Sequence, residues 1–269
     1  MNRTFSIWTL VGFIFGVSLF VYAIIMSTEN YMMFLSLSSL IMVLGGTFAA
    51  MMISFQARYV MRALGTLVMV VFPFHINPQK LTDESKRFLE WSKQIQAGQL
   101  KQVEQEVSGI KDPFLKFATE LLCAGYKGPE LRSLLTDFAE KVYERKMVQT
   151  YILNSMAAAS PAFGMIGTLV GLVIMLDNMG SDVSKIGAGL AVALLTTLYG
   201  VLFAQLLFKP VAEKNGQIEA ILRHRNMILM EGFVLLSEGK SVFKVQDKLN
   251  TFLSPKFWLN QMKGGAPSK

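Results

Sequence analysis

The sequence predicts an all-α membrane protein with four transmembrane helices, because its apolar residues are gathered into four long segments without charge. Hydrophobic residues make up 52% of the 269 residues, and the mean hydropathy of +0.41 is above that of an ordinary soluble domain. A helix needs about 20 apolar residues to cross a bilayer, and each segment has about that length. None of the four contains Asp, Glu, Lys, Arg or His. The segments are Ser6–Met26, Phe34–Phe55, Tyr151–Leu176 and Ile186–Phe208.

The first apolar segment is expected to remain in the protein as a membrane helix. It is longer than the roughly 7–15 apolar residues of a signal-peptide core, and no clear small-residue cleavage site is present. The second segment begins after a very short turn. The two segments therefore predict a helical hairpin.

The distribution of basic residues predicts the orientation of the helices. Of the 26 Lys and Arg residues, 14 lie in 55–150 and ten in 209–269, whereas the two short turns hold only Lys185. Lys and Arg gather on the cytoplasmic side of membrane proteins, so both long polar segments and both termini are expected in the cytoplasm. The net charge of +7 then follows from topology. Nucleic acid is not indicated as a partner, since no basic run is interleaved with aromatic residues.

Breaks between the apolar segments predict four regions. The insert after the first helix pair is expected to be helical: Ser85–Ala97 has an apolar stripe that Gly98 could cap, and Asp112-Pro113 marks a break before a further helix. After Gly128-Pro129 the chain is expected to run helically into the third span. The regions are a first helix pair at 1–55, a cytoplasmic insert at 56–150, a second helix pair at 151–210, and a cytoplasmic helix and tail at 211–269.

Small residues mark one face of each of the last two spans. Helices in lipid associate by close backbone packing at such residues. The two faces are therefore predicted to pack, either against each other or against a helix of a partner chain. The positions are Gly164, Gly167, Thr168 and Gly171 on the third span, and Ala193, Thr197, Gly200 and Ala204 on the fourth.

Each small-residue face carries one hydroxyl, Thr168 on the third span and Thr197 on the fourth. A threonine in a membrane helix often bonds only the carbonyl of residue i−4 in its own helix, and this structural role stays open. Proton and sodium pathways usually need an ionisable residue within the membrane, and the four spans have none. If the chain conducts ions, a partner must supply a carboxylate, and hydroxyl and carbonyl oxygens could complete a hard-cation site.

Enzymatic and metal-dependent functions are not indicated. His75 and His224 are far apart in the sequence, no GxxxxGK phosphate loop is present, and the spans lack a nucleophile–base pair. No cofactor, stable metal or catalytic residue is therefore expected. The single cysteine, Cys123, is predicted to be a reduced thiol packed in a cytoplasmic segment.

Several stretches of the second half resemble the MotA/PomA family of flagellar stator subunits, within the MotA/TolQ/ExbB group of ion-driven motors. The resemblance is strongest to the sodium-type PomA and MotP branch. The four-span layout is similar as well. The stretches are PAFGMIGTLVGL at 161–172, SKIGAGLAVALLTTLYG at 184–200 followed by Pro210, and MEGFVLLSEGKS at 230–241.

The resemblance implies a homo-pentameric ring around two copies of a MotB/PomB-like single-span partner that carries the ion-binding Asp and anchors to peptidoglycan. Ion passage would turn the pentamer and drive the rotor C-ring protein of the flagellum. Thr168 and Thr197 would line the ion path, with Pro161 and Pro210 in conformational coupling. Na⁺ is the expected ion, bound transiently near the two threonines, because the proton-type branch usually has Ala at Thr168. H⁺ is the alternative, because the TolQ and ExbB branches keep threonines and use protons.

The insert departs from the family pattern in the stretch that would face the rotor. The family has an Arg/Lys pair before a glycine-rich turn, and that pair falls here on Ile95 and Gln96. Three hypotheses remain open: a flagellar stator, a TolQ/ExbB-type energiser of another machine, and a structural scaffold without ion flux. The nearest substitutes for the rotor-facing charges are Lys93, Lys101, Glu104 and Glu106.

Overall fold

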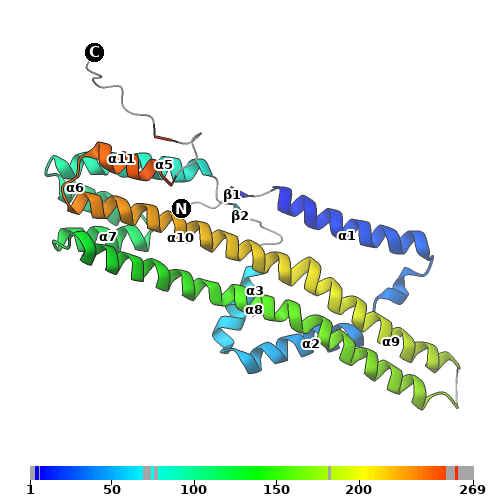
Figure 1. The fold of residues 1–269 in the computed structure, drawn as a ribbon. Helices are drawn as coiled ribbons and strands as arrows, with labels where there is room; N and C mark the ends of the chain where they lie inside the picture. Colours follow the sequence, from blue (N-terminus) through cyan, green and yellow to red (C-terminus); the bar gives the residue numbers. More distant parts are fainter. Residues whose placement is uncertain are drawn as a thin grey trace. The chain divides into compact units, whose positions relative to one another are not determined.

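The computed structural model describes residues 4–5, 7–68, 74–75, 78–180, 183–252 and 258–259, and most of these are helical (Figure 1). Much of the predicted tail after residue 252 lies outside the described residues. Two strands of two residues each, β1 (Thr4–Phe5) and β2 (Phe74–His75), pair with one another. The chain forms two compact units. The membrane unit comprises 5–74 and 146–217, and the insert unit comprises 75–145 and 218–269 with the first four residues.

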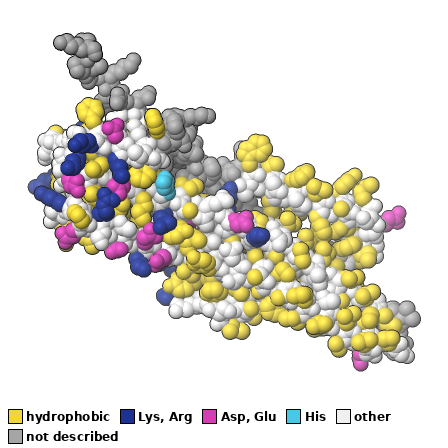
Figure 2. All heavy atoms as spheres, in the orientation of Figure 1, with side chains coloured by type: hydrophobic (Ala, Val, Ile, Leu, Met, Phe, Trp, Pro, Cys, Tyr) yellow, Lys and Arg dark blue, Asp and Glu magenta, His cyan; other side chains and the backbone are white. Residues whose placement is uncertain are grey.

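Within the part of the chain that the structure describes, four helices are long and apolar enough to cross a membrane, which confirms the predicted number of spans. Large apolar side chains on α1, α2, α8 and α9 are widely exposed, as Figure 2 shows for one face. This pattern is expected when lipid is the surrounding solvent. The helices are α1 (Ile7–Ser27), α2 (Leu37–Ser54, preceded by the 3₁₀ turn η1 at Tyr31–Phe34), α8 (Gly128–Asp177) and α9 (Val183–Leu202).

The fourth span changes from α-helix to π-helix just before Pro210, where the sequence predicts the end of the second helix pair. After α9, a π-helical stretch, η2 (Phe203–Phe208), leads directly into α10 (Lys209–Ser237). The N–H of Lys209 reaches back five residues to the carbonyl of Ala204. Pro210 has no N–H to give to the carbonyl four residues before it, so the regular α-helical ladder is interrupted at this point. The predicted edge at Pro210 is thus a change of helical pitch within one continuous run.

Two buried clusters hold the membrane unit together. The first joins α2, α8 and the start of α10 to α3 (Ala57–Thr66). A second, smaller cluster joins α2 to α9, and the Tyr199 hydroxyl there accepts a hydrogen bond of 3.0 Å from the N–H of Ser36. The first cluster contains Met51, Val60, Ala63, Ile152, Leu153, Met156, Phe208, Val211 and Ala212.

The insert unit is helical, as the sequence predicts, and the structure shows that it has its own apolar core. Gly98 ends the first of its helices with a φ of +82°, a conformation that glycine adopts without strain. Asp112 begins the third by accepting hydrogen bonds from the N–H groups of Phe114 and Leu115. The helix α11 was not predicted. The helices are α5 (Pro78–Gln96), α6 (Leu100–Ser108), α7 (Pro113–Cys123), parts of α8 and α10, and α11 (Val242–Asn250).

Candidate functional site

The hydroxyl oxygens of Thr168 on α8 and Thr197 on α9 lie 2.6 Å apart and form a hydrogen bond. Thr168 is half-buried and Thr197 is exposed. The structure therefore brings together the two hydroxyls that the sequence singled out on separate helices. Because Thr197 is exposed, an ion or a side chain from outside this chain can reach the pair.

Two backbone carbonyls complete a cluster of four oxygens around this pair. The Thr168 hydroxyl lies 3.1 Å from the Gly164 carbonyl oxygen and 3.3 Å from that of Ala193, and the Thr197 hydroxyl lies 3.4 Å from the Gly164 oxygen. The two hydroxyls supply two protons, so acceptor lone pairs outnumber donors. Such a cluster can orient water or contribute oxygen ligands to a hard cation, but it carries no charge of its own. Among the described residues, no group of three or more His, Cys, Asp or Glu could hold a metal.

The alternative role of Thr168, bonding only its own helix, does not account for this geometry. Thr168 does reach the carbonyl of residue i−4, Gly164. It also contacts the hydroxyl and a carbonyl of α9. Thr196, one residue from Thr197, instead behaves in the purely structural way: it is fully buried and its hydroxyl bonds the carbonyls of Val192 and Ala193 in its own helix, both at 3.0 Å.

Glycines allow α8 and α9 to approach closely enough for the threonines to meet. A Cβ on Gly171 would lie 2.5 Å from the backbone nitrogen of Ala193, and one on Gly200 would lie 2.8 Å from the Ser160 carbonyl oxygen. Both distances are shorter than side-chain carbons tolerate. A Cβ on Gly164 would lie 2.9 Å from the Thr196 carbonyl oxygen, and one on Gly167 would overlap the Thr196 side chain.

Of the two arrangements that the sequence left open, these contacts belong to the one in which the two small-residue faces pack against each other. The space beside Gly164, Gly167, Gly171 and Gly200 is filled by the neighbouring helix of the same chain. Ala193 and Ala204 are both 1% exposed. The small-residue faces therefore join α8 to α9 within one subunit.

Three residues that contribute to this contact were not singled out from the sequence. Besides Thr196, the buried Ser160 donates a hydrogen bond of 3.0 Å across the helices to the Gly200 carbonyl. Gly189 lies against Met175, where a Cβ would be 2.7 Å from the backbone nitrogen. Its spacing of four residues before Ala193 places Gly189 on the predicted small-residue face, and this spacing could have identified it.

Both predicted coupling prolines lie on the helix runs that carry the threonines. Pro161 lies inside α8, and a Cβ on Gly200 would be 3.1 Å from its Cα. Pro161 cannot donate to the carbonyl of Ala157, so the backbone ladder of α8 is interrupted two turns before Thr168. Pro210 lies in the first turn of α10, directly after the π-helical stretch. Their part in conformational coupling stays a prediction.

The four predicted rotor-facing charges are exposed on α5 and α6 of the insert unit. Glu106 accepts a hydrogen bond of 2.8 Å from the indole nitrogen of Trp91, so it also has a structural role. Partial burial and the charge of Glu104 raise the pKa of Cys123. The thiol is exposed, which corrects the prediction of a packed cysteine. The remaining charges are Lys93 on α5 and Lys101 on α6.

The positions of the missing basic pair have other uses in this chain. Ile95 packs against the core of the insert unit. Gln96 donates a hydrogen bond of 2.6 Å to the carbonyl of Lys240, a residue in the turn between α10 and α11. The chain therefore has an apolar residue and an amide bonded to the backbone at the two positions where the family has a basic pair.

Known proteins share this fold and sequence over nearly the whole chain. The profile of the MotA/TolQ/ExbB proton channel family matches residues 106–227. Motility protein A of Borreliella burgdorferi is 33% identical over 86% of this chain and 88% of its own length, and the uncharacterised YtxD of Bacillus subtilis is 32% identical over 97% and 95%. The C. jejuni MotAB structure superimposes with a TM-score of 0.82 at 22% identity, covering 96% of this chain and all of that one.

These matches agree with the four apolar helices and the helical insert. Members of this family are components of ion channels and not enzymes. An identity above 30% over most of both chains extends the agreement from the fold to the sequence. The chain belongs to the MotA/PomA stator family, within the MotA/TolQ/ExbB proton channel family.

Proposed function

We propose that this chain is the torque-generating stator subunit of a bacterial flagellar motor, and that it forms half of an ion channel in the inner membrane. The observation that supports this function best is the oxygen cluster at Thr168 and Thr197, which lies in spans without any carboxylate. An uncharged oxygen cluster can help to strip water from an ion but cannot neutralise its charge. The missing charge must come from a second protein.

The second protein is proposed to be a MotB/PomB-like single-span subunit that carries an Asp facing the two threonines. Five copies of this chain would surround two copies of that partner, with both termini of this chain in the cytoplasm. Native mass spectrometry of the chain, purified with the single-span protein encoded beside it, tests the assembly. A complex of five and two copies is expected. A monomer, or a ring that excludes the partner, would contradict the channel.

The ion path is tested by exchanging one hydroxyl for a methyl of the same size. Thr197→Val should abolish ion-driven motility and leave the assembled complex intact, because Thr197 is an exposed member of the oxygen cluster. Thr196→Val is the matched control, since that hydroxyl bonds only its own helix and is buried. Swimming of cells expressing each variant, with complex recovered by affinity purification, provides the readout. Normal swimming with Thr197→Val would remove that threonine from the mechanism.

Na⁺ is proposed as the coupling ion and H⁺ is the alternative. A pair of hydroxyls with two carbonyls suits a hard cation, which binds through several oxygens at once. Swimming speed measured against external sodium at fixed pH distinguishes the two ions. Speed that rises and saturates with sodium supports Na⁺, and speed that depends on pH alone supports H⁺.

A TolQ/ExbB-type energiser of a different machine is the second candidate, and the insert unit favours it. Ile95 and Gln96 are engaged within the unit and cannot replace a cationic pair at a rotor. In the flagellar case Lys93, Lys101, Glu104 and Glu106 would have to meet the rotor instead. Deleting the gene with its partner, in a strain with no second stator set, separates the candidates. Loss of swimming supports the flagellar stator, and unchanged swimming supports the other machine.

A further inference from the structure

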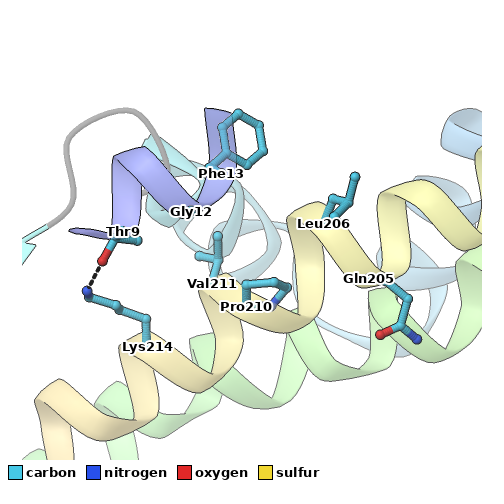
Figure 3. A pocket seen from close by; sticks show the side chains of 8 residues that line it. All are labelled: Thr9, Gly12, Phe13, Gln205, Leu206, Pro210, Val211 and Lys214. Atoms are coloured by element: carbon cyan, nitrogen blue, oxygen red, sulfur yellow. Dashed lines mark hydrogen bonds between the residues drawn. The ribbon is translucent and has the colours of Figure 1, made fainter. Parts of the chain in front are cut away.

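A groove of about 240 Å³ lies in the membrane unit between the first turns of α1 and the junction of η2 with α10 (Figure 3). Most of its wall surface is apolar. A Cβ added at Gly12 would meet no atom within 4 Å, so the absence of a side chain there leaves part of the space open. The lining residues are Thr9, Gly12, Phe13, Gln205, Leu206, Pro210, Val211 and Lys214.

One end of the groove carries a positive charge. The ammonium of Lys214 donates to the hydroxyl of Thr9, and within the described part of the chain it pairs with no carboxylate. An ammonium has three donors, and this contact uses one of them. The half-buried Lys214 therefore has two further donors and, among the described residues, an unpaired positive charge with which it can bind an anion at the end of the groove.

The charged end lies where the sequence places the edge of the bilayer. Trp8 at the start of α1 is 86% exposed, and tryptophan is the side chain most typical of membrane–water interfaces. Lys209, at the start of α10, lies close to the same edge along the chain and is exposed. From this edge α1 and η2 run into the apolar layer, so the groove leads from the head-group level toward the lipid tails.

We propose that this groove binds an anionic phospholipid, with the phosphate at Lys214 and the upper part of one acyl chain against Gly12, Phe13 and Leu206. A phospholipid fits because its two parts complement the groove. Its anionic phosphate matches the ammonium of Lys214 at one end, and its flexible acyl chain matches the apolar walls beyond. The volume suits part of one chain and not a whole lipid. The bound lipid would fill the space beside Pro210, at the π-helical junction. This binding does not depend on the proposed stator role.

Native mass spectrometry of the purified full chain tests the proposal with two lipids that share the same acyl chains. Dioleoylphosphatidylglycerol, which is anionic, is expected to bind about fivefold more tightly than the zwitterionic dioleoylphosphatidylcholine. About fivefold in affinity is what one lysine beside an anionic lipid contributes. Lys214→Gln should abolish this preference, and Lys214→Arg should keep it. Lys209→Gln removes the same charge outside the groove and should leave the preference unchanged.

A second pair of variants tests the acyl site. Gly12→Leu fills the open space and should reduce binding of both lipids. Ser18→Leu places the same side chain elsewhere on α1 and should not reduce binding. Equal binding of the two lipids by the unchanged chain would overturn the proposal. So would a preference that survives Lys214→Gln or is lost with Lys209→Gln, or binding that Gly12→Leu leaves unchanged.

Discussion

Single glycines set the distance between α8 and α9, and that distance decides whether two hydroxyls form a site. At Gly171 and Gly200 the nearest atoms of the other helix belong to its backbone, which cannot move aside as a flexible side chain can. The Thr168–Thr197 hydrogen bond of 2.6 Å is a consequence of this approach. A change of one methyl group at a glycine should therefore disturb the oxygen cluster without touching either threonine.

Gly171→Ala is predicted to destabilise the purified chain and to stop ion-driven activity. The added methyl would lie 2.5 Å from the Ala193 nitrogen, and overpacking of this kind costs about 1–3 kcal/mol. Gly187→Ala is the matched control on α9, because a Cβ there meets nothing within 4 Å and alanine is the better helix former. Thermal stability of both variants in detergent checks the prediction. Equal stability of the two would show that α8 and α9 separate easily.

At the scale of helices, one buried guanidinium joins three elements of the insert unit. Arg225 on α10 lies 2.6 Å from the Glu84 carboxylate of α5 and 2.7 Å from that of Asp112, the residue that begins α7. Its side chain is 5% exposed, whereas its near neighbour Arg223, paired with Glu140, is 45% exposed. The two arginines therefore form a natural comparison of a buried and a surface ion pair.

Arg225→Met is predicted to lower the stability of the chain by an amount near the low end of roughly 3–5 kcal/mol, since it strands two carboxylates that are partly shielded from water. Arg223→Met should cost less than about 1 kcal/mol, because water can replace the lost partner of Glu140. Thermal unfolding of the purified variants, measured side by side, gives the comparison. Similar losses for both would mean that burial of Arg225 adds nothing to its effect.

Hydropathy and helix breaks were enough to predict the four membrane spans and the helical insert, but not α11 or the contacts between the helices. Four apolar segments gave four spans, and Asp112-Pro113 gave the start of α7. Helical spacing placed Thr168 and Thr197 on small-residue faces, yet it could not show that these faces meet within one chain. That outcome depends on how the two helices cross. The crossing also decides that Thr196 is buried and its neighbour Thr197 exposed. The π-helical stretch before Pro210 depends on hydrogen bonds that no sequence period records.

At the scale of the whole chain, charge and apolar surface are segregated by unit. On the face shown in Figure 2, apolar side chains cover α1 and the outer parts of α8 and α9, whereas most of the charged side chains lie on the insert unit. The short turn between α1 and α2 contains Glu29 and no Lys or Arg. By the positive-inside rule this separation predicts that the insert unit lies in the cytoplasm and the turn outside.

Thiol labelling with a membrane-impermeant maleimide tests that orientation, since Cys123 is the single cysteine of the chain and is exposed on the insert unit. Intact spheroplasts should leave Cys123 unlabelled, and permeabilised ones should label it. Labelling should accelerate as pH rises, because the thiolate is the reactive form and burial with the charge of Glu104 raises the Cys123 pKa. Glu104→Gln should lower that pKa and speed the reaction in permeabilised spheroplasts at neutral pH.

The opposite side of the membrane is tested with Asn30→Cys on a Cys123→Ser background, because Asn30 is exposed in the turn between α1 and α2. This variant should label in intact spheroplasts at a rate that permeabilisation does not change. A reversed pattern at the two positions would place the insert unit outside the cell. The charges on α5 and α6 could then not reach a cytoplasmic rotor, and the basic residues would need an explanation other than topology. The expected pattern would place the proposed rotor-facing charges and both termini on the cytoplasmic side, as the proposed stator function requires.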